Sequence, residues 1–259
     1  MTKELTTKTE SGLTVSDQLA EMEAMLGTID PNDILVPKLL LQQGLSKLVS
    51  AEKAQAGDIA DSVTGEVLGS AREKAQKPVK IVPLKFKKVW EHYEKGDDGK
   101  FKYKGVEDWS AANAQIPRFE EYENKDGKIA KSDAALYFYT LVLDGESERP
   151  LPYVVAFRRT NYKSGQKLIN HFALCLEAFK KHKKVVMPFD TTFELSGEKR
   201  TNDEGTWWVW DIRGSSKTPA PVSQSAVSWL NRLASQKVRL DESDIEQVEK
   251  YMEDDVPQY

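Results

Sequence analysis

The chain has 259 residues, of which 39% are hydrophobic and 30% charged, so it can bury one large core or two small ones. No apolar run approaches the roughly 18 residues of a membrane helix, and the polar N-terminus lacks the apolar stretch of a signal peptide. Cys175 is the single cysteine, which excludes a disulfide within the chain, and the three histidines are not spaced to form a zinc site with it. We therefore expect a cytoplasmic protein without a membrane segment, metal or other cofactor.

The net charge of −4 hides an uneven distribution along the chain. Residues 1–36 hold seven acids and two lysines, a net charge of −5. Residues 241–259 hold eight acids and one lysine, a net charge of −7, so residues 37–240 carry +8. A basic body between acidic ends is typical of a domain that binds a polyanion, although a chance distribution of solvated charge explains it almost equally well.

The first part of the chain predicts little regular structure. Residues 1–30 form a polar arm with one short helix, which Ser16 caps and which ends near Leu26. Residues 31–76 are interrupted by proline, glycine and short strand-like pieces. We interpret residues 31–76 as an irregular module that packs on the main domain.

The main domain is expected at residues 77–214, beginning with a strand at 80–90. Alternation in this strand predicts Val82, Leu84 and Phe86 on one face and lysines on the other. A second strand near 101–104 should fold back to make a protruding hairpin.

The centre of the domain is predicted from the strongest apolar patterns. Residues 135–143 are apolar on both faces, as in a buried central strand, and 151–157 should pair with them. A helix is predicted at about 164–181 from helical spacing. Strict alternation then predicts strands at 185–195 and 206–212.

This order of elements favours a mainly β, α+β protein. Strands followed by a helix and two further strands are the order of an OB-fold, a five-stranded Greek-key barrel with a helix between its third and fourth strands. Residues 215–240 are predicted to be a linker and a helix, and residues 241–259 an acidic C-terminal tail.

Aromatic residues interleaved with cations are the chemistry that single-stranded nucleic acid requires, because bases stack on flat side chains while cations follow the phosphates. Trp208 and Trp210 are expected in the core instead, and the two arginines at 158 and 159 have an alternative as ion-pair partners of Asp190 or Glu194. The candidate nucleic-acid-binding residues are Lys85, Lys87, Trp90, Tyr93, Phe101, Lys102, Tyr103, Trp109, Arg158, Arg159, Tyr162, Lys163 and Trp207.

Catalysis has little support in the sequence. There is no phosphate-binding loop, no GxSxG, no HExxH and no CxxC. Asp190, Glu194, Asp203 and Glu204 are candidates for a divalent-metal nuclease site, but carboxylates at strand edges and turns are far more often solvated. We therefore expect no catalytic residues.

The C-terminal tip resembles the acidic tip of bacterial and phage single-stranded DNA-binding proteins. It has consecutive acids, a β-branched residue, a proline and a terminal aromatic, and it departs from the bacterial pattern at Gln258. The wider chain is also similar to phage proteins of this class, through VPKLLLQQGLSKLV, GDIADSVTGEVLG and YVVAFRRTNYKSG. By this resemblance the tip recruits replication and recombination proteins through Asp254, Asp255, Val256, Pro257 and Tyr259.

The sequence therefore predicts an OB-fold protein that coats single-stranded DNA in phage replication or recombination, and it leaves assembly into a homo-oligomer open. Two alternatives stay open. One is a recombination annealing factor or a metal-dependent nuclease. The other is an adaptor or inhibitor whose basic face meets a host protein.

Overall fold

The structure is a computed structural model, and it describes residues 35–72, 76–110, 113–114, 120–143, 150–183, 185–203, 205–235 and 239–240. The helix expected near residues 16–26 and the acidic tail at 241–259 lie outside these ranges. In the described part no helix is long and apolar enough to cross a membrane.

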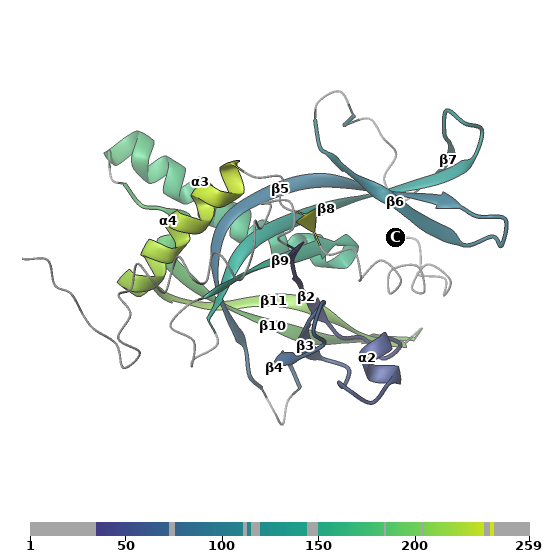
Figure 1. Cartoon of the computed structure of the whole chain (residues 1–259), viewed down its shortest axis with the longest axis horizontal. Coiled ribbons are helices and arrows are strands. Elements are labelled where there is room, and N and C mark those ends of the chain that lie inside the picture. Colours follow the sequence, from purple (N-terminus) through teal and green to yellow (C-terminus); the bar gives the residue numbers. More distant parts are fainter. Residues whose placement is uncertain are drawn as a thin grey trace, which may run out of the picture.

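The protein is mainly β, as expected, and most of its strands join one curled, open sheet (Figure 1). The first strands of the chain are β1 (Leu35–Val36), β2 (Lys38–Leu41), β3 (Asp58–Asp61) and β4 (Val67–Ser70). The middle strands are β5 (Val79–Lys95), β6 (Phe101–Asp108), β7 (Glu121–Glu123), β8 (Ile129–Leu143) and β9 (Leu151–Arg158). The last are β10 (Thr191–Asn202), β11 (Gly205–Lys217) and β12 (Arg239–Leu240).

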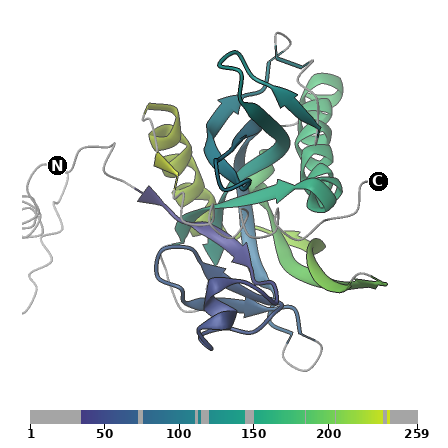
Figure 2. The ribbon, with the colours of Figure 1, turned by 90° about the vertical axis from the view of Figure 1, so that its right-hand side faces the viewer.

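Helices are few, and the two long ones lie on opposite sides of the sheet (Figure 2). They are α3 (Tyr162–His182) and α4 (Ala220–Ser235). The short helices are α2 (Lys47–Ser50) and the 3₁₀ turns η2 (Arg159–Asn161) and η3 (Pro188–Asp190).

The ten-stranded sheet runs in the order β11-β10-β5-β8-β9-β2-β3-β4, with β6 added to β5 and β7 added to β8. Closing the expected five-stranded barrel from β5, β8, β9, β10 and β11 would require the end strands β9 and β11 to pair. Instead β9 pairs in parallel with β2, through Lys38 with Val154 and Leu39 with Val155. The expected barrel is therefore replaced by a half-barrel, because strands from the region predicted to be an irregular module extend the sheet.

One side chain links β11, at one end of the curled sheet, to the loop after β2, where a barrel would use strand pairing. The side-chain amide of Gln43, just after β2, donates to the Trp208 carbonyl at 2.9 Å and accepts from the Trp208 N–H at 2.8 Å. Gly57 allows the close approach, since a Cβ there would lie 2.7 Å from the Trp208 ring. The Gln43 amide thus takes the place of a neighbouring strand at the edge of β11.

A β-bulge in β5 overturns the predicted alternation of that strand. The register with β8 shifts between Pro83 and Lys85, so one extra residue is inserted. Val82 and Leu84 pack in one core while Phe86 packs against the other. Phe86 therefore lies on the opposite face from the two residues with which it was predicted to align.

The sheet has a hydrophobic core on each face. The concave core includes Phe138, Phe157 and Trp210, and α3 covers it with Leu168 and Phe172. The convex core includes Val89 and Tyr139 and is covered by α4 through Ala226 and Leu233. These two residues are seven positions apart, so they lie on the same face of the helix. Two covered faces explain why β8, predicted to be central, is apolar on both sides.

The strand predicted at 185–195 begins only at Thr191. Asp190 ends a 3₁₀ turn in which its carboxylate accepts the Met187 N–H at 2.8 Å, and Pro188 has no N–H to give a sheet. The other predicted elements match β8, β9, α3, β11 and α4, with ends that differ by a few residues.

Candidate nucleic-acid interface

The basic corner between β9 and α3 turns two arginines towards buried acids. The Arg158 Nε donates to both carboxylate oxygens of Glu91, at 2.8 and 2.7 Å. The Arg159 Nε donates to Asp133 Oδ2 at 2.5 Å. Their side chains are 19% and 23% exposed, while both carboxylates are fully buried. The partners are therefore residues of β5 and β8, not Asp190 or Glu194 as the alternative suggested.

Tyrosines complete this arginine corner, the group formed by Arg158, Arg159, Glu91 and Asp133. The hydroxyls of Tyr93 and Tyr137 donate to the Glu91 carboxylate, the first at 3.0 Å. Burial raises the pKa of Asp133, against the lowering effect of Arg159. Burial and the Glu91 charge also raise the pKa of Tyr93 well above its ordinary value. The corner is thus an internal network, in which Arg158 and Arg159 each form an ion pair with a buried carboxylate.

Arg159 also has an unusual backbone, with a φ of 45° in the left-handed region. Such a conformation costs a non-glycine residue about 1 to 3 kcal/mol, so the surroundings must hold it. The ion pair with Asp133 does so, and it directs the chain from β9 into η2 and α3. The Asp133 Oδ1 and Arg159 Nη2 atoms are buried without a hydrogen-bond partner in the described structure.

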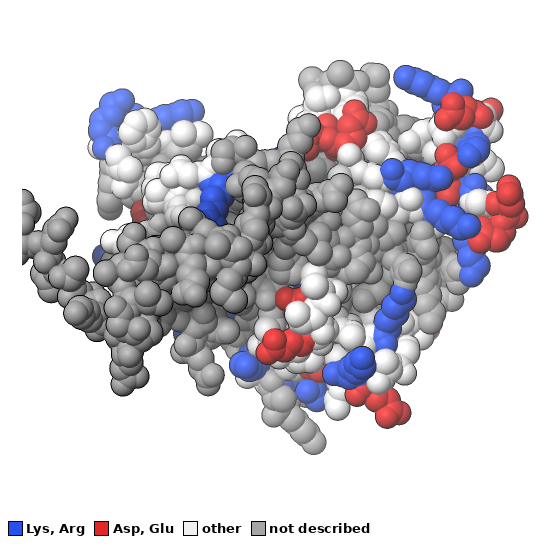
Figure 3. All heavy atoms as spheres, in the orientation of Figure 1, with Lys and Arg blue, Asp and Glu red and all other residues white. Residues whose placement is uncertain are grey.

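The predicted hairpin exists and is part of a larger arm, formed by β6, β7 and the halves of β5 and β8 that pair with them (Figure 1). Its charges alternate in sign, as Figure 3 shows on the right of the molecule. Each of five lysines there lies within 4.0 Å of an acid: Lys87 with Asp108, Lys95 with Glu121, Lys102 with Asp98, and Lys104 and Lys128 with Glu94. The arm is therefore a mixed-charge surface and not a basic one.

The aromatic rings of the arm are largely unavailable for stacking on bases. Trp90 and Tyr93 are buried, with 0% and 2% exposure, and Phe101 is 9% exposed. Tyr103 packs edge-on against Tyr93, with ring centroids 5.8 Å apart. Trp109 is 37% exposed, but the Lys88 Nζ lies 3.9 Å from the centre of its ring. Burial removes Trp90 and Tyr93 from the surface that a strand could contact.

Lys85 lies apart from the arm, and it is half-buried. Its Nζ is 5.9 Å from the centre of the Tyr139 ring, which belongs to the convex core. The sequence therefore grouped residues that the structure places on different surfaces.

The start of α3 meets the edge of β11, and the remaining predicted residues, Tyr162, Lys163 and Trp207, belong to these two elements. The Asn161 side chain accepts the Trp210 N–H at 2.6 Å, and the Ser164 hydroxyl donates to the Trp210 carbonyl at 2.6 Å. These bonds place Tyr162 and Lys163 beside β11. Trp207 lies three residues from Trp210 on the same strand, about 10 Å away at the usual rise of a strand.

Both elements of this junction carry cations. Arg200 lies directly opposite Trp207 in the β10–β11 register. Lys167 pairs with Asp211 at 3.0 Å, and bonds from Arg213 and Lys167 outweigh burial to lower the pKa of Asp211. Lys163 is exposed and has no ion-pair partner in the described structure. We define the α3–β11 junction by Tyr162, Lys163, Lys167, Arg200 and Trp207.

Two residues of the junction, Lys167 and Arg200, were not among the predicted site residues. Arg200 could have been found from the turn after Asn202, because pairing Thr201 with Thr206 places Arg200 opposite Trp207. Lys167 could not, since its position depends on where α3 crosses β11. As expected, Trp208 and Trp210 pack with the concave core.

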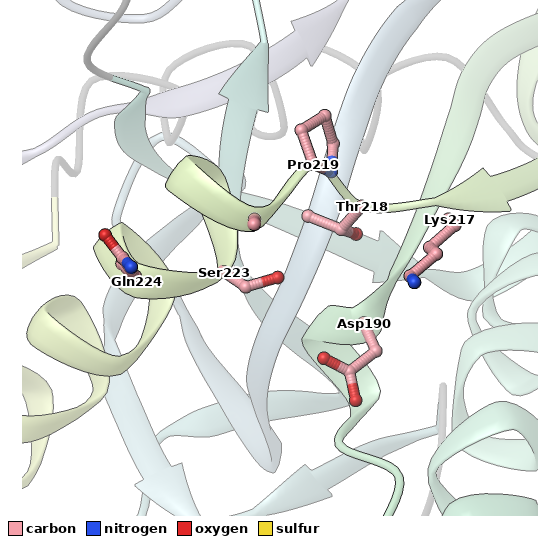
Figure 4. A pocket seen from close by; sticks show the side chains of 7 residues that line it. Asp190, Lys217, Thr218, Pro219, Ser223 and Gln224 are labelled. Atoms are coloured by element: carbon pink, nitrogen blue, oxygen red, sulfur yellow. The ribbon is translucent and has the colours of Figure 1, made fainter.

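One open hollow of about 500 Å³ lies where β11 runs into α4 (Figure 4). Asp190 and Lys217 lie on one side of it, while Ser223 and Gln224 come from the first turns of α4. The described residues hold no group of three or more His, Cys, Asp or Glu side chains that would bind a metal ion. The predicted tail residues Asp254, Asp255, Val256, Pro257 and Tyr259 lie outside the described residues.

The fold defines a mainly β protein, with a curled open sheet between two helices. A family model described as Pam3 phage gp34-like protein matches residues 8–239, and the chain belongs to this phage family. The comparisons with curated proteins and with solved structures give no match.

Proposed function

We propose that the chain is a phage protein that binds single-stranded DNA at the α3–β11 junction, without catalysing a reaction. The observation that carries the proposal is the position of Trp207, half-buried on β11 opposite Arg200 and near the start of α3. An aromatic ring with a cation beside it suits a base that stacks while its phosphate is neutralised.

The proposed surface is smaller than the one predicted from the sequence. Tyr162, Lys163 and Trp207 remain in it, and Lys167 and Arg200 join it. The arm is left out because its lysines face acids and two of its rings are buried. Arg158 and Arg159 lie just before α3, and their ion pairs with Glu91 and Asp133 anchor the chain where the helix begins.

The C-terminal segment is proposed to contact replication and recombination proteins, on the strength of its resemblance to the tips of single-stranded DNA-binding proteins. This part of the proposal concerns partners and is independent of the DNA surface.

A fluorescence titration with oligo(dT) tests the DNA surface. If Trp207 stacks on a base, Trp207→Ala should weaken binding by about 1 to 3 kcal/mol, and raising the salt concentration should weaken binding further. The matched control is Trp229→Ala on α4, where Arg232 lies 5.1 Å from the centre of the tryptophan ring. Trp229 also has a cation over its ring, but it belongs to α4 and not to the α3–β11 junction, so its replacement should leave the affinity unchanged.

Three results would contradict the proposal. Failure of the wild-type protein to bind oligo(dT) at low salt would reject the function. Equal oligo(dT) affinity of the wild type and Trp207→Ala would mean that the DNA binds at a surface other than the α3–β11 junction. Cleavage of the oligonucleotide with added magnesium would favour the nuclease alternative.

A further inference from the structure

The C-terminal end of α3 continues beyond the core that the helix covers. Leu168, Phe172 and Cys175 lie on one stripe of the helix, and all three pack inward. Phe179 continues this stripe at helical spacing but is 50% exposed, and neighbouring Leu176 is 53% exposed. The helix face made for packing is therefore left uncovered over its last two turns.

This end is also basic. Lys180, Lys181 and Lys183 lie there with a single acid, Glu177, which pairs with Lys181 at 3.0 Å. Lys180 and Lys183 have no ion-pair partner among the described residues. Figure 3 shows Lys and Arg side chains gathered at the projecting end of α3, on the upper left. We call Leu176, Phe179, Lys180, Lys183 and the 70%-exposed Val185 the α3 overhang.

We propose that the α3 overhang is the docking site of this chain's own acidic segment, residues 241–259. That segment has a net charge of −7, and its apolar residues Ile245, Val248 and Met252 recur at helical spacing. An acidic sequence with an apolar stripe complements a basic surface with exposed leucine and phenylalanine. A nucleic-acid backbone would use the lysines but would gain nothing from Leu176 or Val185.

The segment is long compared with α3. Nineteen residues follow Leu240, the last described residue, and an extended chain of that length reaches about 60 Å. The whole of α3, with 21 residues, is about 30 Å long. The inference does not depend on DNA binding, because the docking would occur in the protein alone.

Zero-length carbodiimide coupling of the full-length protein at low salt, followed by peptide mapping, tests the docking. We expect amide links from Lys180 or Lys183 to acids of residues 241–259. The double variant Leu176→Ser/Phe179→Ser keeps every lysine, and it should lower the yield of these links about tenfold. The control is Leu174→Ser, since Leu174 is 66% exposed but points away from the stripe; it should leave the yield unchanged.

Several outcomes would overturn the inference. Links made equally to Lys163 or Lys199, or links unaffected by the double variant, would mean that the segment has no docking site on the overhang. Links formed only between copies, in a mixture of isotopically light and heavy protein, would assign the occupant to a second molecule. If the double variant keeps its links and oligo(dT) abolishes them, the lysines belong to a nucleic-acid site. Circular dichroism of each variant verifies that it is folded.

Discussion

Arg158 carries its charge into the interior of the protein, where it neutralises a carboxylate that water cannot reach. Glu91 is fully buried and accepts hydrogen bonds from the Arg158 guanidinium and from Tyr93 and Tyr137. Burying a charge is tolerated only when it is paired and hydrogen-bonded, so the partners of Glu91 depend on one another. An arginine in a basic sequence run is thus a structural residue here.

Replacing Arg158 should destabilise the fold strongly. Arg158→Leu leaves the Glu91 carboxylate without its cation, and we expect the free energy of unfolding in urea to fall by about 3 to 5 kcal/mol. Arg200→Leu is the matched control, because Arg200 pairs with Glu198 at the surface and is 54% exposed. Its loss should cost about 1 kcal/mol or less. If both variants lose a similar free energy of unfolding, the buried pair stabilises the fold no more than the exposed one.

At the scale of the element, α3 depends on one small residue for its position. Gly165 faces the sheet where α3 crosses β9, and a Cβ there would lie 2.9 Å from Phe157 and 3.0 Å from Leu136. Only a residue without a side chain lets the helix backbone come this close. The same approach brings Ser164 and Lys167 to β11, and so it builds the α3–β11 junction.

Gly165→Val should therefore destabilise the protein although valine forms helices better than glycine. Overpacking a close helix–sheet contact costs about 1 to 3 kcal/mol, more than the propensity gain of a few tenths. Ala173→Val, at an exposed position of the same helix, should change the unfolding free energy by less than about 1 kcal/mol. An unchanged urea midpoint for Gly165→Val would mean that α3 can move away from β9 at no cost.

At the scale of the whole molecule, the side chain of Gln43 bridges the curled sheet from the loop after β2 to β11. Gln43 satisfies both backbone groups of Trp208, which would otherwise lie along an open edge. Open edges favour pairing with other chains, so capping them with an amide also protects the protein from association. Gln43 thus replaces part of the strand pairing that a closed barrel would have.

Gln43→Ala should loosen this seam. We expect the loss of two hydrogen bonds to lower the free energy of unfolding by about 1 to 3 kcal/mol. The Trp208 amide should exchange with deuterium about tenfold faster or more. Gln166→Ala removes an exposed amide from α3 and should alter neither quantity. If Trp208 stays as protected in Gln43→Ala as in the wild type, another contact closes the sheet.

The sequence by itself determined the main strands, both long helices and the core position of Trp208 and Trp210, because alternation and helical spacing are local consequences of burial. Only the tertiary structure decided the architecture. The partner of β9 lies more than a hundred residues away in β2, and no local pattern in either strand specifies it. The acids that meet Arg158 and Arg159 are also distant, on β5 and β8. A basic run shows that charge is present, but the fold decides whether that charge faces water, a phosphate or a buried carboxylate.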